Sequence, residues 1–316
     1  MNKTILLTWF WLISVSIFAA PTKVRLILNW KPEAEFGGFY AAKLAGHYEK
    51  AGLDVEILPG GVGTPVIQMV EGGKAEFGIS SADEVVISRA KGASLIALFA
   101  AYQTSPTAIM TRSERGFKHL KDVFTNEGTL AAERGLAYMR FLEKKYGFSK
   151  LKIVPYIGGV SQMQSDPKMS QQCFLFAEPL QARKAGLKPQ AFLVAESGFN
   201  PYNTIVITQD GYLKKNPEVV EAFVKATRQG WEAYQKNPTA ANKHMAELNP
   251  TMDLETFTEG AKAQSELIEN GETKKHGIGT MNEERWTVLA QQLKDLGLVD
   301  KTFPAATYFR PLSQPK

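Results

Sequence analysis

Short apolar stretches alternate with stretches of helical spacing along the chain after residue 20. The apolar stretches predict strands at 23–29, 54–58, 76–79 and 95–101. Between them, Gly52 and Gly92 stand where helices are expected to end. This alternation predicts parallel βαβ units, in which ligands bind beyond the carboxyl ends of the strands.

Three strand-end loops are expected to meet at one rim of this sheet, and they lie at 28–43, 59–64 and 80–81. In the first of them, which reads LNWKPEAEFGGFYAAK, Gly37 and Gly38 let the chain turn tightly into a helix, and Phe39 is expected in the core. The sequence from Ser81 to Glu84 fits a capping box, which predicts a helix that begins after Ser81.

The same alternation is repeated on a smaller scale between about residues 112 and 200, and a helical tail follows. Strands are expected at 107–111, 128–132, 151–155, 173–177, 191–195 and 204–208, with a helix at 136–146. Ser105-Pro106 and Asn200-Pro201 break the pattern where the chain crosses between its two parts.

These two crossings predict an α/β fold with two lobes. Lobe 1 is expected to contain residues 21–106 and 207–316, including the helical C-terminal tail, and lobe 2 residues 107–206. A cleft between two lobes that are joined by two crossings can close like a hinge on a small ligand.

Residues 1–20 have the layout of a secretory signal peptide. Lys3 supplies positive charge, 5–18 is mostly apolar, and small residues precede Pro21. An anchor helix is the alternative, and the immediate proline without a stop-transfer pattern disfavours it. No Cys follows the expected cleavage site, so a lipid anchor there is excluded and we expect an exported protein.

The composition excludes several classes of function. The chain has 37 basic and 32 acidic residues, which are interspersed, and this does not suggest nucleic-acid binding. Cys173 is its only cysteine, so the exported protein has no internal disulfide. The four histidines lack metal-ligand spacing, and neither a metal nor another cofactor is expected.

Catalytic motifs are also absent from the sequence. Gly-x-Ser-x-Gly does not occur, and Cys173 has no context that marks a nucleophile. The turn from Gly60 to Pro65 superficially resembles a dinucleotide fingerprint, but Val66 occupies the third glycine position. We favour a flexible turn before a capped helix, where Gly61 and Thr64 can face a polar ligand atom.

Aromatic and acidic residues at strand ends are the first candidates for ligand contacts. Trp30 lies just past a strand end, where its indole can stack on a planar ligand, and Tyr102 ends the fourth strand. Glu178 is expected at the carboxyl end of the strand 173–177, and Tyr156 follows another strand. Glu178 can accept hydrogen bonds from a ligand ring, or it can serve only as an acidic residue at a helix start.

Several pieces of the chain together resemble one family. They are Leu28-Asn29-Trp30, 38–42, 46–48, 51–56, 72–78, Glu178-Pro179, 211–213 and Asn216-Pro217. The family is the periplasmic substrate-binding proteins of ABC importers that are related to thiamine-pyrimidine biosynthesis proteins. The resemblance implies a class II two-lobed fold, a periplasmic location, a membrane permease as partner, and ring contacts from Trp30 and Glu178.

The resemblance implies a small heteroaromatic ligand, with a formyl-aminopyrimidine thiamine precursor as first choice and riboflavin or another planar metabolite as second. The chain departs from its relatives at 33–38, where Glu33 and Glu35 form either a solvated loop or the place at which its ligand differs from theirs. It departs again at 131–135, where Arg134 can pair with an acidic ligand group or simply with Glu133 and solvent. The family also includes a pyrimidine synthase with a histidine, a lysine cofactor site and a Cys-rich motif. Here 171–175 holds one Cys and the opening loop no His, so we predict a binding protein and not an enzyme.

We expect this binding protein to be a monomer. Its predicted ligand site comprises Trp30, Glu35, Phe36, Gly61, Thr64, Ser80, Ser81, Tyr102, Arg134, Tyr156 and Glu178.

Overall fold

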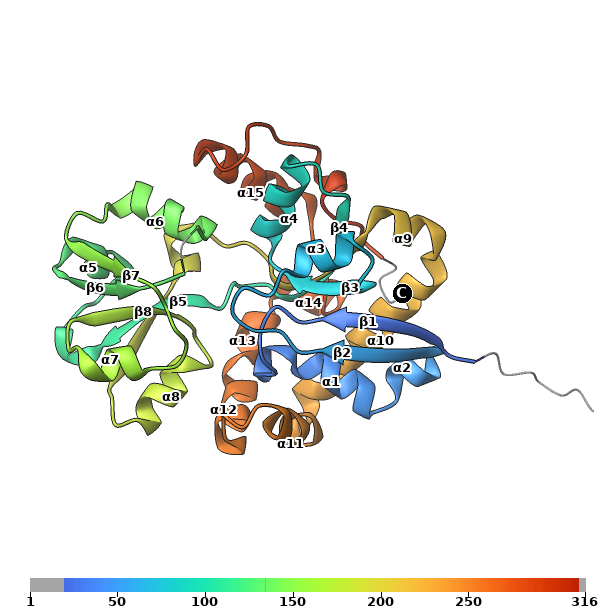
Figure 1. The fold of residues 1–316 in the computed structure, drawn as a ribbon, viewed down its shortest axis with the longest axis horizontal. Coiled ribbons are helices and arrows are strands. Elements are labelled where there is room, and N and C mark those ends of the chain that lie inside the picture. Colours follow the sequence, from blue (N-terminus) through green and yellow to red (C-terminus); the bar gives the residue numbers. More distant parts are fainter. Residues whose placement is uncertain (1–19, 134, 313–316) are drawn as a thin grey trace, which may run out of the picture.

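The computed structural model describes residues 20–133 and 135–312. These residues form two lobes, each built on a five-stranded sheet that is flanked by helices (Figure 1). The predicted α/β class and the two-lobed architecture are confirmed. The signal peptide predicted at residues 1–20 lies almost wholly outside the described residues.

Lobe 1 contains a sheet with the strand order β2-β1-β3-β10-β4. Its strands are β1 (Thr22–Ile27), β2 (Leu53–Leu58), β3 (Phe77–Ser80), β4 (Leu95–Tyr102) and β10 (Asn203–Gln209). β1 runs parallel to β2 and β3, whereas β10 lies antiparallel between β3 and β4. The loops that follow β1, β2 and β3 therefore leave the sheet at the same edge, as expected for parallel units.

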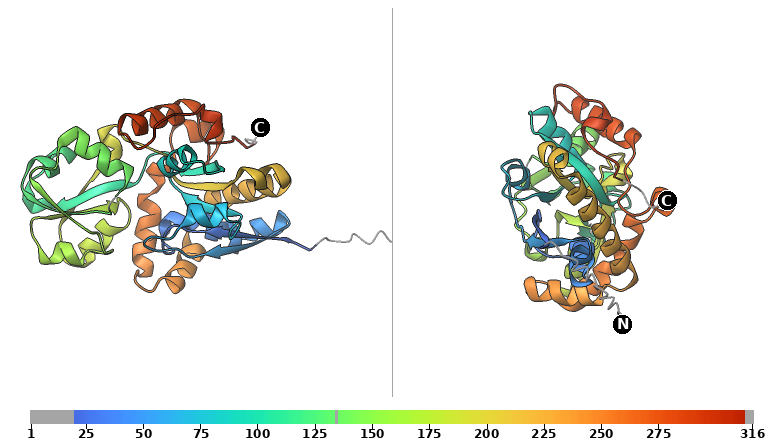
Figure 2. Two further views of the ribbon diagram at one scale, coloured as in Figure 1. Left: turned by 45° about the horizontal axis from the view of Figure 1, so that its top comes forward. Right: turned by 90° about the vertical axis from the view of Figure 1, so that its right-hand side faces the viewer.

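Helices cover both faces of this sheet. Those that come before β10 in the chain are η1 (Ala34–Phe36), α1 (Gly37–Leu44), α2 (His47–Lys50), α3 (Val66–Glu71) and α4 (Ala82–Ala90). Those that follow β10 all lie on lobe 1 (Figure 2), and they are α9 (Asp210–Lys215), α10 (Pro217–Lys236), α11 (Thr239–Leu248), α12 (Leu254–Ala263), α13 (Ser265–Ile268), α14 (Gly271–His276), α15 (Glu283–Asp295) and η4 (Ala305–Thr307).

Lobe 2 repeats the arrangement with the strand order β7-β6-β8-β5-β9. Its strands are β5 (Thr107–Arg112), β6 (Gly128–Ala131), β7 (Leu151–Val154), β8 (Met169–Phe174) and β9 (Pro189–Leu193). Its helices are η2 (Ser113–Arg115), α5 (Leu120–Thr125), α6 (Ala137–Tyr146), α7 (Ser161–Ser165), α8 (Glu178–Lys184) and η3 (Val194–Ser197).

In each sheet an antiparallel strand occupies the fourth place, and in each case it is the strand that follows a crossing. β5 enters lobe 2 after the first crossing, and β10 enters lobe 1 after the second. β10 begins at Asn203 and pairs with β3 and β4 of lobe 1, so the division expected at 206/207 falls within this strand. The two crossings thus connect two sheets of the same topology.

The glycine pair at the start of α1 has a packing role. Gly37 has an ordinary helical φ of −55°, so the sequence-based interpretation of the pair as a tight turn is wrong. A Cβ atom on Gly37 would lie 2.0 Å from the ring of Tyr234, and one on Gly38 would lie 2.1 Å from that of Trp231. The pair is therefore needed because α1 packs closely on α10.

One predicted strand lies in a different place from the observed one. The sequence predicts a strand at 173–177, whereas β8 begins at Met169 and ends at Phe174. Ser170 and Gln171 are buried in this strand although they are polar. Hydropathy alone therefore misses the first half of β8, since it assigns polar residues to the surface.

The lobes also touch away from the two crossings. Lys184 Nζ of α8 lies 2.6 Å from Asp253 Oδ1 and 2.8 Å from Glu255 Oε2, which belong to lobe 1. Phe176, which precedes α8, stacks on Tyr102 of β4 with ring centroids 5.4 Å apart. The segment that leads into α8 is therefore held against lobe 1, and this contact brings its first residue, Glu178, toward the η1 region.

Candidate functional site

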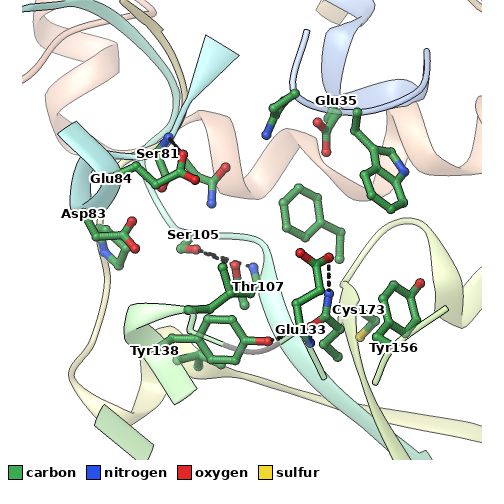
Figure 3. Close-up of a pocket in the computed structure, with 18 of the residues that line it drawn as sticks. Glu35, Ser81, Asp83, Glu84, Ser105, Thr107, Glu133, Tyr138, Tyr156 and Cys173 are labelled. Carbon is green, nitrogen blue, oxygen red and sulfur yellow. Dashed lines mark hydrogen bonds between the residues drawn. The ribbon is translucent and has the colours of Figure 1, made fainter. Parts of the chain in front are cut away.

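A pocket of about 270 Å³ lies between the lobes, near the lower end of the range of small-molecule sites, ~300–1,000 Å³. Lobe 1 supplies residues from the loops after β1, β2 and β3, and lobe 2 supplies residues from β8 and the loops after β6 and β7. Figure 3 shows side chains from both lobes converging on this space. The rim predicted from the strand ends is thus one wall of a two-sided pocket.

Seven of the predicted ligand residues line the pocket, namely Trp30, Glu35, Gly61, Thr64, Ser81, Tyr156 and Glu178. Phe36 is instead fully buried in the core of lobe 1. Ser80 is buried and donates a hydrogen bond to Glu84 Oε2 over 2.6 Å. Arg134 lies outside the described residues. The predicted ligand contacts themselves stay a prediction.

Tyr102 does not line the pocket either, because β4 is buried along its whole length. The Tyr102 ring contacts Phe176 and Trp231, and its hydroxyl donates to Gln264 Oε1. The side chain at the end of a central strand is here a core residue. Its position in the sequence could not distinguish that role from a place in the cleft.

One end of the pocket, which we call the acid–aromatic end, consists of Trp30, Glu33, Glu35, Tyr156, Phe174 and Glu178. Trp30 Nε1 donates a hydrogen bond to Glu33 Oε1 over 3.1 Å. Glu178 accepts one from the Tyr156 hydroxyl over 2.6 Å and one from the Phe174 backbone N–H over 2.8 Å. Three residues, 175–177, separate Glu178 from the end of β8, so it is placed by the start of α8 and not by the strand.

The three carboxyl groups at this end, of which Glu35 is buried and Glu33 and Glu178 are half-buried, interact with one another, and all three have raised pKa values. Burial raises the pKa of Glu33 to about 8, with a further contribution from the negative charge of Glu178. Burial, then Glu33 and Glu178, holds the pKa of Glu35 well above its usual range. Burial also raises the pKa of Glu178, against its two hydrogen bonds. Perturbed carboxyl groups in a cleft mark a functional site.

The opposite end, which we call the hydroxyl end, consists of Ser81, Asp83, Glu84, Ser105, Thr107 and Asn203. Ser81 and Glu84 form the predicted capping box at the start of α4. Burial and the neighbouring Glu84 raise the pKa of Asp83 to about 6. Ser105 Oγ donates to Thr107 Oγ1 over 3.2 Å across the first crossing. Figure 3 places Ser81, Asp83 and Glu84 across the pocket from Glu35 and Tyr156.

Lobe 2 closes the pocket with a polar network around Gln172. Gln172 Oε1 accepts from the Glu133 backbone N–H over 2.6 Å and from the Tyr138 hydroxyl over 3.1 Å. Its Nε2 donates to Glu133 Oε1 over 3.0 Å. Cys173 is buried beside this network, and burial together with the Glu178 charge raises the pKa of its thiol. A thiol held in its neutral form is a poor nucleophile.

Acidic side chains dominate the lining. Among the described residues that line the pocket there are six carboxyl groups and no Lys, Arg or His, the acids being Glu33, Glu35, Asp83, Glu84, Glu133 and Glu178. In the same described part of the chain, no group of three His, Cys, Asp or Glu side chains is arranged to hold a metal ion. The pocket therefore suits a ligand that offers hydrogen-bond donors or positive charge.

Only some of these pocket residues could be recognised from the sequence. Glu133 lies two positions after the last residue of β6, and Asp83 lies in the recognised capping box, so the strand-end argument could have reached both. Gln172 and Tyr138 had no comparable signal, because one lies within a strand and the other within a helix. Their role in the pocket depends on the way in which the second lobe faces the first.

The fold defines the class of protein. The periplasmic aliphatic sulphonate binding protein SsuA from Escherichia coli superimposes with a TM-score of 0.70 at 12% identity, over 94% of each chain. A Candida albicans protein described as having the generic periplasmic binding protein fold gives a TM-score of 0.65 at 15% identity, over 94% of this chain and 98% of that one. The chain therefore has the fold of the two-lobed periplasmic binding proteins.

The sequence defines the family within that class. Residues 33–241 match the NMT1/THI5 like family, and the chain belongs to this family, which confirms the resemblance seen in the sequence. Among the part of the chain that the structure describes, no helix is both long and apolar enough to cross a bilayer.

Relatives with this architecture carry two kinds of name. The riboflavin-binding protein RibY from Chloroflexus aurantiacus is 23% identical over 89% of this chain and 83% of that protein. The formylaminopyrimidine-binding protein from Halalkalibacterium halodurans is 22% identical over 83% of this chain and 82% of that protein. A 4-amino-5-hydroxymethyl-2-methylpyrimidine phosphate synthase from Schizosaccharomyces pombe is 20% identical over 89% of this chain and 83% of that protein.

Proposed function

We propose that this protein is the exported binding component of an ABC import system, and that it closes on a small heteroaromatic ligand and delivers it to a membrane permease. A thiamine pyrimidine precursor is the ligand that we favour. The proposal is supported by the family, by relatives that are named for binding formylaminopyrimidine and riboflavin, and by a pocket between two hinged lobes.

The acid–aromatic end is the observation that carries the proposal. The Trp30 indole offers a flat apolar surface, on which a heteroaromatic ring can stack. Glu33 and Glu178 lie beside it, and their oxygens can accept hydrogen bonds from ring amino groups. An anion such as a sulphonate suits this end poorly, because no basic side chain lines it among the described residues.

Riboflavin is the second ligand that the relatives support. Its fused ring can also stack on an indole, whereas its long polar side chain would have to occupy the hydroxyl end. Mass spectrometry of the protein purified under native conditions distinguishes the two ligands by mass. Bound flavin would in addition colour the protein yellow, and a colourless preparation with a bound pyrimidine would support our first choice.

A pyrimidine synthase is the alternative of a different class, and several relatives carry that name. The neutral, buried thiol of Cys173 and the absence of a His or Lys among the described lining residues favour a binding protein instead. A binding protein should gain thermal stability at saturating ligand, by about 3 kcal/mol at a hundredfold excess over Kd, without turnover. Conversion of the ligand, or of the protein's own side chains, would contradict the binding function.

Export is part of the same proposal, and its test is independent of the ligand. Expression of the full chain in a Gram-negative host should yield a protein in the periplasmic fraction whose N-terminus begins near residue 20 or 21. Retention of residues 1–20 in the membrane fraction would instead support the anchor helix.

A further inference from the structure

Glu35 has an unusual position within the acid–aromatic end. It lies in the short helix η1, its side chain is only 3% exposed, and it lines the pocket (Figure 3). The carboxyl group of Glu35 accepts no hydrogen bond from any described residue. Burying a carboxyl group without a partner is unfavourable, and more so when the group is charged.

A second acceptor at the same wall is also without a partner. Asn29 lines the pocket directly before Trp30, and its Oδ1 atom is buried and receives no hydrogen bond from the described residues. Glu33 and Glu178, by contrast, each accept hydrogen bonds from protein groups. Of the two acceptors without a partner, the Glu35 carboxyl group is the one that points into the pocket, so a ligand can supply its donor.

The three carboxyl groups come from both lobes. Glu33 and Glu35 belong to lobe 1, whereas Glu178 begins α8 in lobe 2. Without a positive charge between them, the three groups avoid mutual repulsion by holding protons, which is the direction of their raised pKa values. A cation bound between them would let them ionise together. The Trp30 and Phe174 rings line the same end and can contribute cation–π attraction.

We propose that Glu33, Glu35 and Glu178 form a site for a protonated amine, so that the ligand is a heteroaromatic ring that carries a positively charged alkylamine. This inference rests on the proposed function and narrows its ligand class. A metal ion does not explain the cluster, because the described residues contain no arrangement that could hold one.

The pH dependence of ligand affinity distinguishes the amine site from a competing arrangement. If the acids were protonated and donated hydrogen bonds to ring nitrogens, a neutral ligand would suffice and affinity would fall as pH rises. If they bind a cation, ligand binding displaces their protons, and affinity rises from about pH 6 to about pH 8 while the alkylamine stays charged. The other ionisable groups that interact with the cluster are Tyr102, Tyr138, Tyr156, Cys173 and the exposed Lys31.

Two probes of nearly equal size test the charge directly. They are 4-amino-5-aminomethyl-2-methylpyrimidine, whose alkylamine is protonated at neutral pH, and its uncharged 5-hydroxymethyl analogue. In isothermal titration calorimetry, we expect the wild-type protein to bind the aminomethyl probe at least about tenfold more tightly. We also expect proton release, seen as a dependence of the binding enthalpy on the ionisation enthalpy of the buffer.

A charge-removing substitution separates Glu35 from the rest of the pocket. Glu35→Gln should weaken the aminomethyl probe about tenfold or more and change the hydroxymethyl probe by less than about threefold. Glu221→Gln, an exposed acid on α10, is the matched control and should leave both affinities unchanged. Thermal unfolding of each variant confirms that it is folded, and the wild-type comparison of the two probes stands without any variant.

The outcomes distinguish the two proposals. Equal affinity for both probes, or affinity that falls from about pH 6 to about pH 8, would overturn the amine site and leave the pyrimidine-binding function in place. Binding of neither probe would contradict the pyrimidine function, and the amine site would fall with it. Selective binding of the aminomethyl probe with proton release supports both.

Discussion

The two ends of the pocket contain acidic residues in different surroundings. At the hydroxyl end, Glu84 accepts hydrogen bonds from Ser80 and from the Ser81 backbone N–H, so its charge belongs to a helix cap. At the acid–aromatic end, Glu35 is buried without such a partner and two further carboxyl groups lie near it. Glu84 therefore has its hydrogen-bond partners within the protein, whereas Glu35 has none among the described residues. Ligand specificity should therefore depend mainly on the acid–aromatic end.

The largest expected effect comes from the aromatic surface at that end. Trp30→Ala should weaken ligand binding by about a hundredfold, because it removes both the stacking surface and the donor to Glu33. Trp30→Phe keeps a ring and should cost less than about tenfold. Calorimetry on both variants, with circular dichroism to confirm the fold, makes the comparison. Unchanged affinity in Trp30→Ala would place the ligand elsewhere in the cleft.

Substitution of Glu178 should have the second-largest effect on ligand affinity. Glu178→Gln keeps an acceptor for only one of its two protein donors, the Tyr156 hydroxyl and the Phe174 N–H, and it removes the charge. We expect affinity to fall about 30-fold, which is ~2 kcal/mol for a charged hydrogen bond. Tyr156→Phe, which removes only the hydroxyl, should have a smaller effect. If Tyr156→Phe weakens binding as much as Glu178→Gln, the tyrosine and not the carboxylate is the ligand contact.

The pKa of Glu33 gives a stability effect in the absence of ligand. Its folded pKa of about 8 lies above its ordinary value of 4.5, so the folded state holds the proton more tightly than the unfolded state. The resulting stabilisation is fully present below about pH 4.5 and is lost as pH rises through about 8. Glu33→Gln should remove this part of the pH dependence, and its Tm relative to wild type should rise across that window. A constant Tm difference from pH 4.5 to pH 8 would show that Glu33 titrates normally.

The sequence was sufficient for the architecture because local signals specify it. The capping box at Ser81 and the apolar runs of β1, β2 and β4 each depend on a few neighbouring residues. The crossings at Pro106 and Pro201 followed from the same local reasoning. Trp30 could be predicted to line the pocket because it follows a strand that the hydropathy pattern predicts.

The arrangement of the pocket was less accessible, because it depends on contacts between distant segments. Glu178 lies near Glu33 because Phe176, two residues before it, stacks on Tyr102. No pattern in the sequence links residues that are so far apart along the chain. The same contact explains why Tyr102 is a core residue and not a ligand contact. The roles of Glu33 and Glu35 were left open by the sequence, since an acidic loop is usually solvated, and only burial distinguishes them from such a loop.

Substitutions at the hydroxyl end should have the smallest effect on ligand affinity, and they therefore also test the comparison of the two ends. Thr107→Ala removes the acceptor of the 3.2 Å hydrogen bond from Ser105, and a neutral hydrogen bond of this kind contributes roughly 0.5–1 kcal/mol. We therefore expect ligand affinity to fall by only about twofold to fivefold in a calorimetric titration. Thr107→Ser, which keeps the hydroxyl, is the matched control. A loss in Thr107→Ala that approached the loss in Trp30→Ala would mean that the ligand is held at both ends, as expected for a molecule long enough to span the pocket.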